Sequence, residues 1–410
     1  MGNTWNRRSF LKGTGATALG MTVASLTPQA LSAENDTPTP DALAPTPPMG
    51  WNSWYCFRRN VTQEDVRAAA DVMVSSGMRD VGYNYVNIDG SWQGKRDANG
   101  VLQPNERFPD IKSLSDYIHA KGLKFGMYSG PGPFTCGGDP ASYGHEEQDA
   151  ETFASWGVDF LKYDLCTFRK IMLHDAPNDP AKQFELMKQA YARMHRALLK
   201  TGRPIVYSLC QYGIDYVWEW GAEVGGNLWR TSHDIRPDYI TMAEVGFSQA
   251  GLSKYAGPGR WNDPDMLQVG NGGMSPNGEM TQMSLWAILA APLLASTDLT
   301  KMTEPTKRIL MNREVIAVNQ DPLGKQGDRV WQKGPVELWA KPLSGGDVAV
   351  GLFNRLTWNT PIRFDLADLG WTGPAKARDL WTHQEIGIIR DSYSAWAPSW
   401  GVVLLRLSKA

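Results

Sequence analysis

Carboxylate side chains end two short motifs of the chain. Asp164 follows an apolar run and lies two residues after Lys162. If this run is a β-strand, both side chains point to the same face, because side chains alternate along a strand. A nearby ammonium group favours the ionised form of a carboxylate. Asp234 ends the second motif, four residues after Arg230. A structural ion pair is the alternative interpretation of each motif.

Two carboxylates on either side of a sugar can hydrolyse a glycosidic bond, and we expect Asp164 and Asp234 to form such a pair. One attacks the anomeric carbon or activates water, while the other protonates the leaving oxygen. A separation of about 5–5.5 Å retains the configuration of the sugar, and one of roughly 6.5–9.5 Å inverts it. A third cluster contains Asp263, Pro264 and Asp265. Asp265 is a candidate ligand of sugar hydroxyls, whereas Asp263 is expected to support a turn, the usual role of Asp-Pro sequences.

These residues lie at the ends of alternating strand and helix patterns. Such alternation over residues 48–321 predicts parallel βα units that close into a (β/α)8 TIM barrel, which places its active site at the carboxyl ends of the strands. An open doubly wound sheet is the alternative, but the sequence has no Gly-rich dinucleotide or phosphate turn to support it. The predicted strands are 85–88, 123–128, 160–163 and 205–209, and the predicted helices are 64–76, 111–121, 148–156 and 183–200.

Residues 322–410 follow a different pattern. Short runs of β-forming residues are separated by Gly-Gly, Asn and Pro turns. This pattern predicts a C-terminal antiparallel β-sandwich domain. The runs are 329–331, 336–340, 348–353 and 402–407.

The N-terminus has the order of a secretion signal. Arg7 and Arg8 precede a short, weakly apolar run, and small residues follow at 30–33. Residues 1–33 are therefore predicted to be a twin-arginine signal peptide that directs export to the periplasm or the extracellular space. Residues 34–47 are rich in Pro and Thr and are predicted to be a linker.

Composition excludes several classes of function. The chain has 410 residues, of which 42% are hydrophobic and 20% charged, so it can bury a core and is not disordered. The net charge is −2, which argues against a nucleic-acid or anionic-membrane partner. The six histidines include no pair at metal-ligand spacing, so we expect neither a catalytic metal nor a cofactor. The partner is expected to be a small-molecule, oligosaccharide or polysaccharide substrate.

Four cysteines allow three full disulfide pairings in an exported protein. Cys136 and Cys166 follow neighbouring predicted strands, which favours a bridge between them at the barrel rim. Four buried thiols are the alternative.

Together these motifs resemble glycoside hydrolase family 27, the α-galactosidase and α-N-acetylgalactosaminidase family. The resemblance runs in family order over nearly the whole mature chain. The matching segments are 49–54 (MGWNSW), 87–89 (NID), 121–129 (KGLKFGMYS), 142–150 (SYGHEEQDA), 156–159 (WGVD), 162–164 (KYD), 229–230 (WR), 256–259 (AGPG), 261–267 (WNDPDML) and 318–324 (VNQDPLG).

The resemblance implies a barrel followed by an antiparallel β-domain and a retaining mechanism without a metal. By matching position, Asp164 is the nucleophile and Asp234 the acid/base, and Cys136 and Cys166 form a disulfide beside the nucleophile. Charged groups that bind hydroxyls and an aromatic wall for the apolar side suit a pyranose. The residues implied to line the terminal-sugar pocket are Trp54, Asp89, Tyr128, Lys162, Arg230 and Asp265.

The sequence departs from the family pattern around the pocket. Gly90 stands where family galactosidases carry the second of two consecutive Asp residues, which together bind the 4- and 6-hydroxyls. Gln211-Tyr212 replaces Glu-Trp, and Gln211 is expected to contact the sugar near its 2-position. His233, directly before the implied acid/base, is commonly a small residue in relatives.

These observations lead to one main hypothesis and several alternatives. The main hypothesis is an exported retaining exo-glycosidase that releases terminal α-galactose. Because Gly90 removes a ligand of the 6-hydroxyl, a β-L-arabinopyranosidase is the first alternative, and an isomaltose-releasing specificity is another. A carbohydrate-binding protein without catalysis and a metal-dependent barrel hydrolase are the alternatives from other classes.

Overall fold

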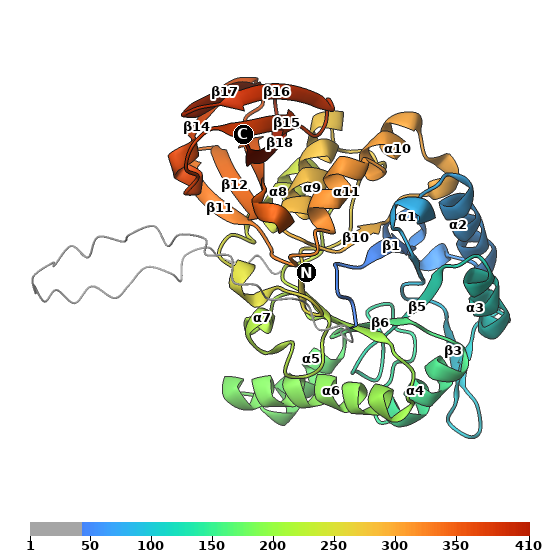
Figure 1. Ribbon diagram of the computed structural model, residues 1–410. Coiled ribbons are helices and arrows are strands. Elements are labelled where there is room, and N and C mark those ends of the chain that lie inside the picture. Colours follow the sequence, from blue (N-terminus) through green and yellow to red (C-terminus); the bar gives the residue numbers. More distant parts are fainter. Residues whose placement is uncertain (1–42) are drawn as a thin grey trace, which may run out of the picture. The chain divides into compact units, whose positions relative to one another are not determined.

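Parallel strands form a barrel in the computed structural model, which describes residues 43–410 (Figure 1). Its strands are β1 (Met49–Asn52), β2 (Tyr85–Asn87), β5 (Lys124–Ser129), β6 (Phe160–Asp164), β7 (Val206–Cys210), β8 (Leu228–Arg230), β9 (Trp261–Asp263) and β10 (Leu293–Ala295). They follow the order β10-β1-β2-β5-β6-β7-β8-β9. A parallel bridge between Leu267 and Ala295 joins the segment after β9 to β10 and closes the ring. The predicted (β/α)8 barrel is confirmed.

Helices alternate with these strands, and capping side chains set where several of them begin. Asp110, Asp179 and Asp238 each accept a backbone N–H from the first turn of the helix that follows. Thr62 and Asp65 form a capping box at the start of another helix. The helices are α1 (Trp54–Phe57), α2 (Gln63–Ser75), α3 (Ile111–Ala120), α4 (Glu146–Ser155), α5 (Phe168–Asp175), α6 (Pro180–Lys200), α7 (Val217–Trp220), α8 (Tyr239–Phe247), α9 (Pro276–Ile288), α10 (Glu304–Leu310) and α11 (Arg313–Asn319).

A hairpin that the periodicity does not predict follows β2. It consists of β3 (Gln93–Arg96) and β4 (Leu102–Pro104). The Arg96 guanidinium pairs with the buried Asp149 of α4, with 2.7 Å between Nη1 and Oδ1. This ion pair fixes the hairpin against the barrel wall, next to the loop that leaves β2.

The C-terminal part is the predicted antiparallel β-sandwich. A six-stranded sheet has the order β11-β12-β13-β18-β15-β16, and β14 pairs with β17 in a second sheet. Apolar side chains of both sheets form a core of their own, because alternate residues of each strand face inward. The strands are β11 (Asp328–Lys333), β12 (Val336–Pro342), β13 (Val348–Asn354), β14 (Thr360–Asp365), β15 (Ala375–Asp379), β16 (Gln384–Ile389), β17 (Ser392–Ala397) and β18 (Val402–Lys409).

Helices α8 and α9 join the sandwich to the barrel. The ring of Phe247 on α8 meets that of Phe353 on β13 edge-on at 5.4 Å, and Tyr239 stacks on Trp400 at 4.9 Å. The Lys341 ammonium is buried here and donates to the carbonyl oxygens of Ala287 and Asn319, at 3.3 and 3.2 Å. Contacts with the sandwich therefore support the barrel on the side of α8 and α9.

The N-terminal predictions fall mainly outside the described residues. The predicted signal peptide, residues 1–33, lies there entirely. Of the predicted linker, residues 43–47 are described, and they lie against the barrel: Ala44 is buried and its carbonyl oxygen accepts the indole N–H of Trp261 at 2.9 Å. Within residues 43–410 no helix has the length and apolar character needed to span a bilayer.

Candidate active site

A cavity opens at the carboxyl ends of the barrel strands, where the sequence places the site. It has about 460 Å³ of empty volume. Strands β1, β2, β5, β6, β7 and β8 each contribute a lining side chain at or just beyond their last residues. Both predicted catalytic carboxylates line this one cavity. The lining residues are Trp54, Tyr55, Asp89, Gly90, Ser91, Tyr128, Thr135, Cys136, Gly137, Lys162, Asp164, Tyr212, Arg230, Asp234 and Met266.

Asp164, the last residue of β6, has both carboxylate oxygens held by tyrosines. Tyr212 donates to Oδ1 at 2.7 Å, and Tyr128 donates to Oδ2 at 3.1 Å. Burial raises the pKa of Asp164, and the positive charge of Lys162 and the hydrogen bond from Tyr212 offset only part of that rise. The carboxylate is therefore oriented but poorly solvated, which suits a group that forms and breaks a bond.

Lys162 points into the same cavity as Asp164, as the alternation along a strand predicts, but its ion pair is with a different residue. Its ammonium lies 2.7 Å from Oδ2 of Asp89, beyond the end of β2. Asn52 donates to the same oxygen at 3.1 Å. Burial alone would favour the neutral amine, but the charge of Asp89 raises the pKa of Lys162 above its usual value. Lys162 and Asp89 thus form a fixed, charged wall of the cavity.

Arg230, the last residue of β8, bridges two carboxylates. Its guanidinium lies 2.8 Å from Oδ1 of Asp234 and 3.0 Å from Oδ1 of Asp265. The Asp234 side chain is 60% exposed, so water and a leaving group can reach it. Burial opposes the charge of Asp234, but the adjacent Arg230 outweighs this effect and lowers the pKa of Asp234.

Asp265 is buried and does not line the cavity, so its predicted contact with sugar hydroxyls has no support in this geometry. Besides Arg230, it accepts hydrogen bonds from the Tyr55 hydroxyl at 2.8 Å and the backbone N–H of Ile235 at 2.9 Å. These contacts hold the segment that carries Asp234. Asp263 accepts the backbone N–H of Asp265 at 2.9 Å, which is the expected turn.

Gln211 also lies outside the cavity, and its side chain is fully buried. Its amide oxygen accepts the N–H of Gly213 at 2.7 Å, and its amide nitrogen donates to the carbonyl oxygen of Ile214 at 3.3 Å. The predicted contact between Gln211 and the sugar has no support in this geometry, because the amide is used to close the turn after β7.

The wall beside Asp89 lacks a second carboxylate. The backbone N–H of Gly90 donates to Oδ1 of Asp89 at 2.9 Å. A Cβ at position 90 would lie 3.3 Å from the nearest ring carbon of Tyr128, so a side chain there would enter the space next to this ring. The cavity is therefore wider, and less negative, at this corner than it would be with Asp at position 90.

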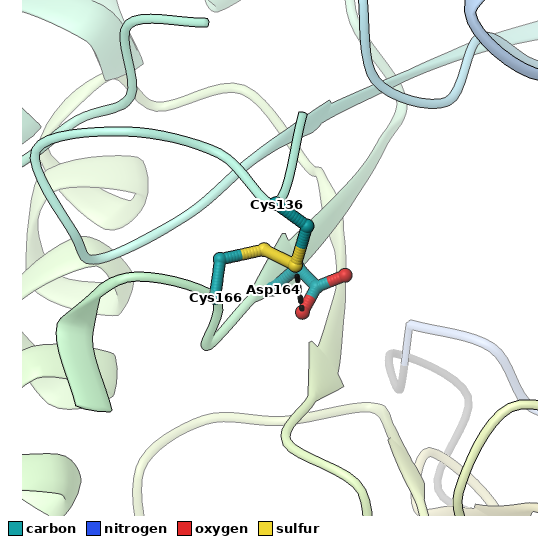
Figure 2. A group of neighbouring side chains, drawn as sticks. All are labelled: Cys136, Asp164 and Cys166. Carbon is teal, nitrogen blue, oxygen red and sulfur yellow. Dashed lines mark hydrogen bonds between the residues drawn. A yellow bond between two sulfur atoms is a disulfide. The ribbon is translucent and has the colours of Figure 1, made fainter. Parts of the chain in front are cut away.

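The predicted disulfide between Cys136 and Cys166 is present (Figure 2). Cys136 lines the cavity. Sγ of Cys136 lies 3.9 Å from Oδ1 of Asp164, and Sγ of Cys166 lies 3.2 Å from the hydroxyl of Tyr128. The bridge thus joins the loop after β5 to the segment that follows the carboxylate. Cys56 and Cys210 are free thiols, and Cys210 is buried on β7.

Two tyrosines of the site were not predicted from the sequence. Tyr212 contacts Asp164, and Tyr55 contacts Asp265. The sequence marked Tyr212 only as a replacement of the family's Trp. Tyr55 directly follows Trp54, the last residue of a matching segment, and this proximity was the one available signal for it.

The fold and the cavity define a class: a (β/α)8 barrel with paired carboxylates at its carboxyl edge and a β-sandwich behind it. Known proteins place the chain within that class. Residues 46–321 match the family model described as alpha galactosidase A, and residues 333–407 match the one described as alpha galactosidase C-terminal beta sandwich domain. The chain belongs to the α-galactosidase family of glycoside hydrolases, family 27.

Individual relatives agree with this assignment. Alpha-galactosidase A of Cellvibrio japonicus is 42% identical over 90% of this chain and 93% of that protein. Among solved structures, alpha-galactosidase I from Mortierella vinacea superposes with a TM-score of 0.83 at 35% identity, covering 91% of this chain and 99% of that one. A β-L-arabinopyranosidase from Geobacillus stearothermophilus gives 0.76 at 26% identity, covering 90% and 97%.

Proposed function

We propose that this glycoside hydrolase removes terminal α-galactosyl groups with retention of configuration, using Asp164 as the nucleophile and Asp234 as the acid/base. The observation that carries the proposal is that these two carboxylates, one at the end of β6 and one in the segment after β8, line one cavity. The relatives named alpha-galactosidase support the choice of substrate.

In the first step, a carboxylate oxygen of Asp164 forms a bond to the anomeric carbon while the bond from that carbon to the leaving oxygen breaks. Asp234 transfers its proton to the leaving oxygen. The positive charge of Lys162 opposes the effect of burial on Asp164 and helps keep it ionised. Trp54 offers an aromatic face to the apolar side of the sugar.

In the second step, Asp234 removes a proton from water, and the water oxygen bonds to the anomeric carbon while the ester to Asp164 breaks. The lowered pKa of Asp234 favours the ionised form that this step requires. The first step requires the protonated form, so we expect it to slow as the pH rises. No metal or cofactor takes part in this scheme, because side chains supply every charge and proton.

The sugar preferred at the pocket is a second question, on which Gly90 bears directly. A hydrogen bond from a sugar hydroxyl to a carboxylate contributes about 1.5–3 kcal/mol. Gly90 cannot supply one to a 6-hydroxyl, so β-L-arabinopyranose, which has the ring stereochemistry of galactose without the 6-hydroxymethyl group, is the second candidate. The structural similarity to a β-L-arabinopyranosidase supports β-L-arabinopyranose as this second candidate.

A substrate screen tests the proposed function. The nitrophenyl glycosides of α-galactose, α-N-acetylgalactosamine and β-L-arabinopyranose are compared by kcat/KM. We expect turnover of the α-galactoside, with the arabinoside as the closest competitor. Binding of the sugars without release of nitrophenol from any of them would contradict the proposal.

We also propose that the protein is exported by the twin-arginine route. The order of residues in 1–33 supports this proposal, and a disulfide at the cavity favours an oxidising compartment. Replacing Arg7 and Arg8 by Lys together should leave the protein in the cytoplasmic fraction. An unchanged distribution would contradict the proposal.

A further inference from the structure

Tyr212 contacts the proposed nucleophile, Asp164, and no sequence pattern predicted this contact. Its hydroxyl donates to Oδ1 of Asp164 at 2.7 Å, shorter than the 3.1 Å contact from Tyr128 to Oδ2.

The backbone at Tyr212 is in the left-handed region, with a φ of +66°. Such a conformation is unfavourable for a residue with a side chain and persists where the surroundings impose it. Here the surroundings are a turn closed by the Gln211 amide, which bonds to Gly213 and Ile214. The N–H of Gly213 also donates to the carbonyl oxygen of Arg230 at 2.9 Å.

Gly213 packs too closely against its neighbour to carry a side chain. Its φ is +76°, and an added Cβ would lie 2.4 Å from the carbonyl oxygen of Thr231. The turn therefore sits directly against the segment after β8. On its other side the Arg230 guanidinium lies 5.7 Å from the centre of the Tyr212 ring, within the range of a cation–π contact.

We infer that Tyr212 is a positioning residue for Asp164, and that the turn from Gln211 to Gly213 directs the Tyr212 hydroxyl toward that carboxylate. This inference rests on the proposed nucleophilic role of Asp164. The two residues that depart from the family pattern then act as one unit: Gln211 shapes the turn, and Tyr212 makes the contact. The Gln211 amide nitrogen donates to Ile214, which a Glu carboxylate cannot do.

The hydrogen bond from Tyr212 matters most when Asp164 carries its full charge. It stabilises the carboxylate before attack and again as the carboxylate departs from the sugar in the second step. In the ester intermediate the oxygens of Asp164 are poorer acceptors, so the bond contributes less there. Losing the hydroxyl should therefore slow the breakdown of the intermediate more than its formation.

Other charged or titratable groups face Asp164 and set the background for a pH experiment. They come from the barrel strands, from helix α6 and from the rim of the cavity. These groups are Lys162, Asp89, Arg230, Tyr128, Cys210, Tyr191 and Asp234. Replacing Tyr212 by Phe leaves all of them in place.

The test compares Tyr212→Phe with Tyr255→Phe. Tyr255 donates to Oε1 of Glu219 at 2.9 Å and lies outside the cavity, so its variant loses the same kind of hydrogen bond elsewhere. For Tyr212→Phe we expect kcat to fall about tenfold, the size of effect for a hydrogen bond to a charged group. We also expect kcat/KM to fall by a smaller factor than kcat, so that KM falls as well. The acidic limb of the pH profile should move to higher pH, because the hydrogen bond from Tyr212 lowers the pKa of Asp164.

Gln211→Glu should change the same quantities in the same direction by a smaller factor, and Tyr255→Phe should change none of them. Thermal unfolding of each variant monitors folding. An acidic limb and a kcat-to-KM pattern in Tyr212→Phe that match Tyr255→Phe would overturn the inference.

Covalent labelling separates this inference from the proposed function. An activated 2-deoxy-2-fluoro-galactoside should leave its sugar on Asp164, located by peptide mass mapping. If Asp164 is not labelled, the proposed function fails first. If Asp164 is labelled and the kinetics of Tyr212→Phe are unchanged, only the role of Tyr212 fails.

Discussion

Position 90 offers the sharpest test of how this cavity selects its sugar. Replacing Gly90 by Asp places a carboxylate beside Asp89, where the resemblance to family galactosidases predicts one. The backbone at Gly90 is not in the left-handed region, so an L-residue can adopt it without strain. The new side chain meets Tyr128, whose nearest ring carbon would lie 3.3 Å from the added Cβ, and a shift of a few tenths of an ångström in that ring accommodates it.

The expected size of the effect follows from one charged hydrogen bond. Such a bond to the 6-hydroxyl contributes about 1.5–3 kcal/mol, which corresponds to roughly 10- to 100-fold in kcat/KM. Two features place the result at the lower end: the close approach to Tyr128, and a further negative charge near Asp89 and Asp164, which raises the pKa of the nucleophile. We therefore expect kcat/KM for the galactoside, divided by that for the arabinoside, to rise about tenfold.

The assay measures both nitrophenyl substrates with Gly90→Asp, Gly90→Asn and Gly90→Ala in parallel. Asn has the shape of Asp without its charge, and Ala has only the added Cβ. If the reasoning is right, the ratio rises in the order Ala, Asn, Asp. An equal ratio in all three variants would refute it, because selection of the sugar would then not depend on a carboxylate at this position.

Three further predictions concern the reaction itself. Asp164→Asn should lower kcat by at least about 10³-fold, as expected for the loss of a nucleophile, and azide should restore turnover and give a product of inverted configuration; absence of both effects would remove Asp164 from this role. Burial raises the pKa of Asp164, and Arg230 lowers the pKa of Asp234, so the bell-shaped profile of kcat/KM against pH should be narrow. Arg230→Gln should move the basic limb of this profile to higher pH, because the pKa of Asp234 then rises. A basic limb that does not move would contradict the assignment of Asp234 as the acid. Replacing Cys136 and Cys166 together by Ser should lower kcat/KM by roughly 10- to 100-fold, because the bridge lies at the cavity wall. The control variant, Cys56→Ser, should have little effect on kcat/KM. Equal kinetics in both variants would argue against a role for the disulfide in shaping the site.

Much of the fold could be predicted because it depends on periodicity. Alternating strand and helix patterns identified the barrel, and the regular alternation along β6 correctly placed Lys162 and Asp164 on the same side. The partner of Lys162 could not be predicted in this way. Asp89 lies beyond another strand, and its proximity to Lys162 depends on how that strand is placed in the closed barrel.

Residues in turns were harder to predict, since their directions depend on backbone conformations that periodicity does not reveal. Gln211 was predicted to contact the sugar, yet its amide closes a turn. Tyr212, its neighbour, has a left-handed backbone, and its hydroxyl contacts Asp164. Asp265 similarly lies in a turn with a φ of +99°, which directs its carboxylate to Arg230 and Tyr55 rather than into the cavity.

The central claim is that Asp164 attacks the anomeric carbon while Asp234 serves the opposite face of the bond as acid and then as base. The most direct measurement is proton NMR of the galactose first released from an α-galactoside, recorded before the anomers interconvert. Two successive displacements predict that the α-anomer forms first and the β-anomer grows in only by mutarotation. Initial formation of the β-anomer would contradict the claim, because water would then have attacked the sugar directly.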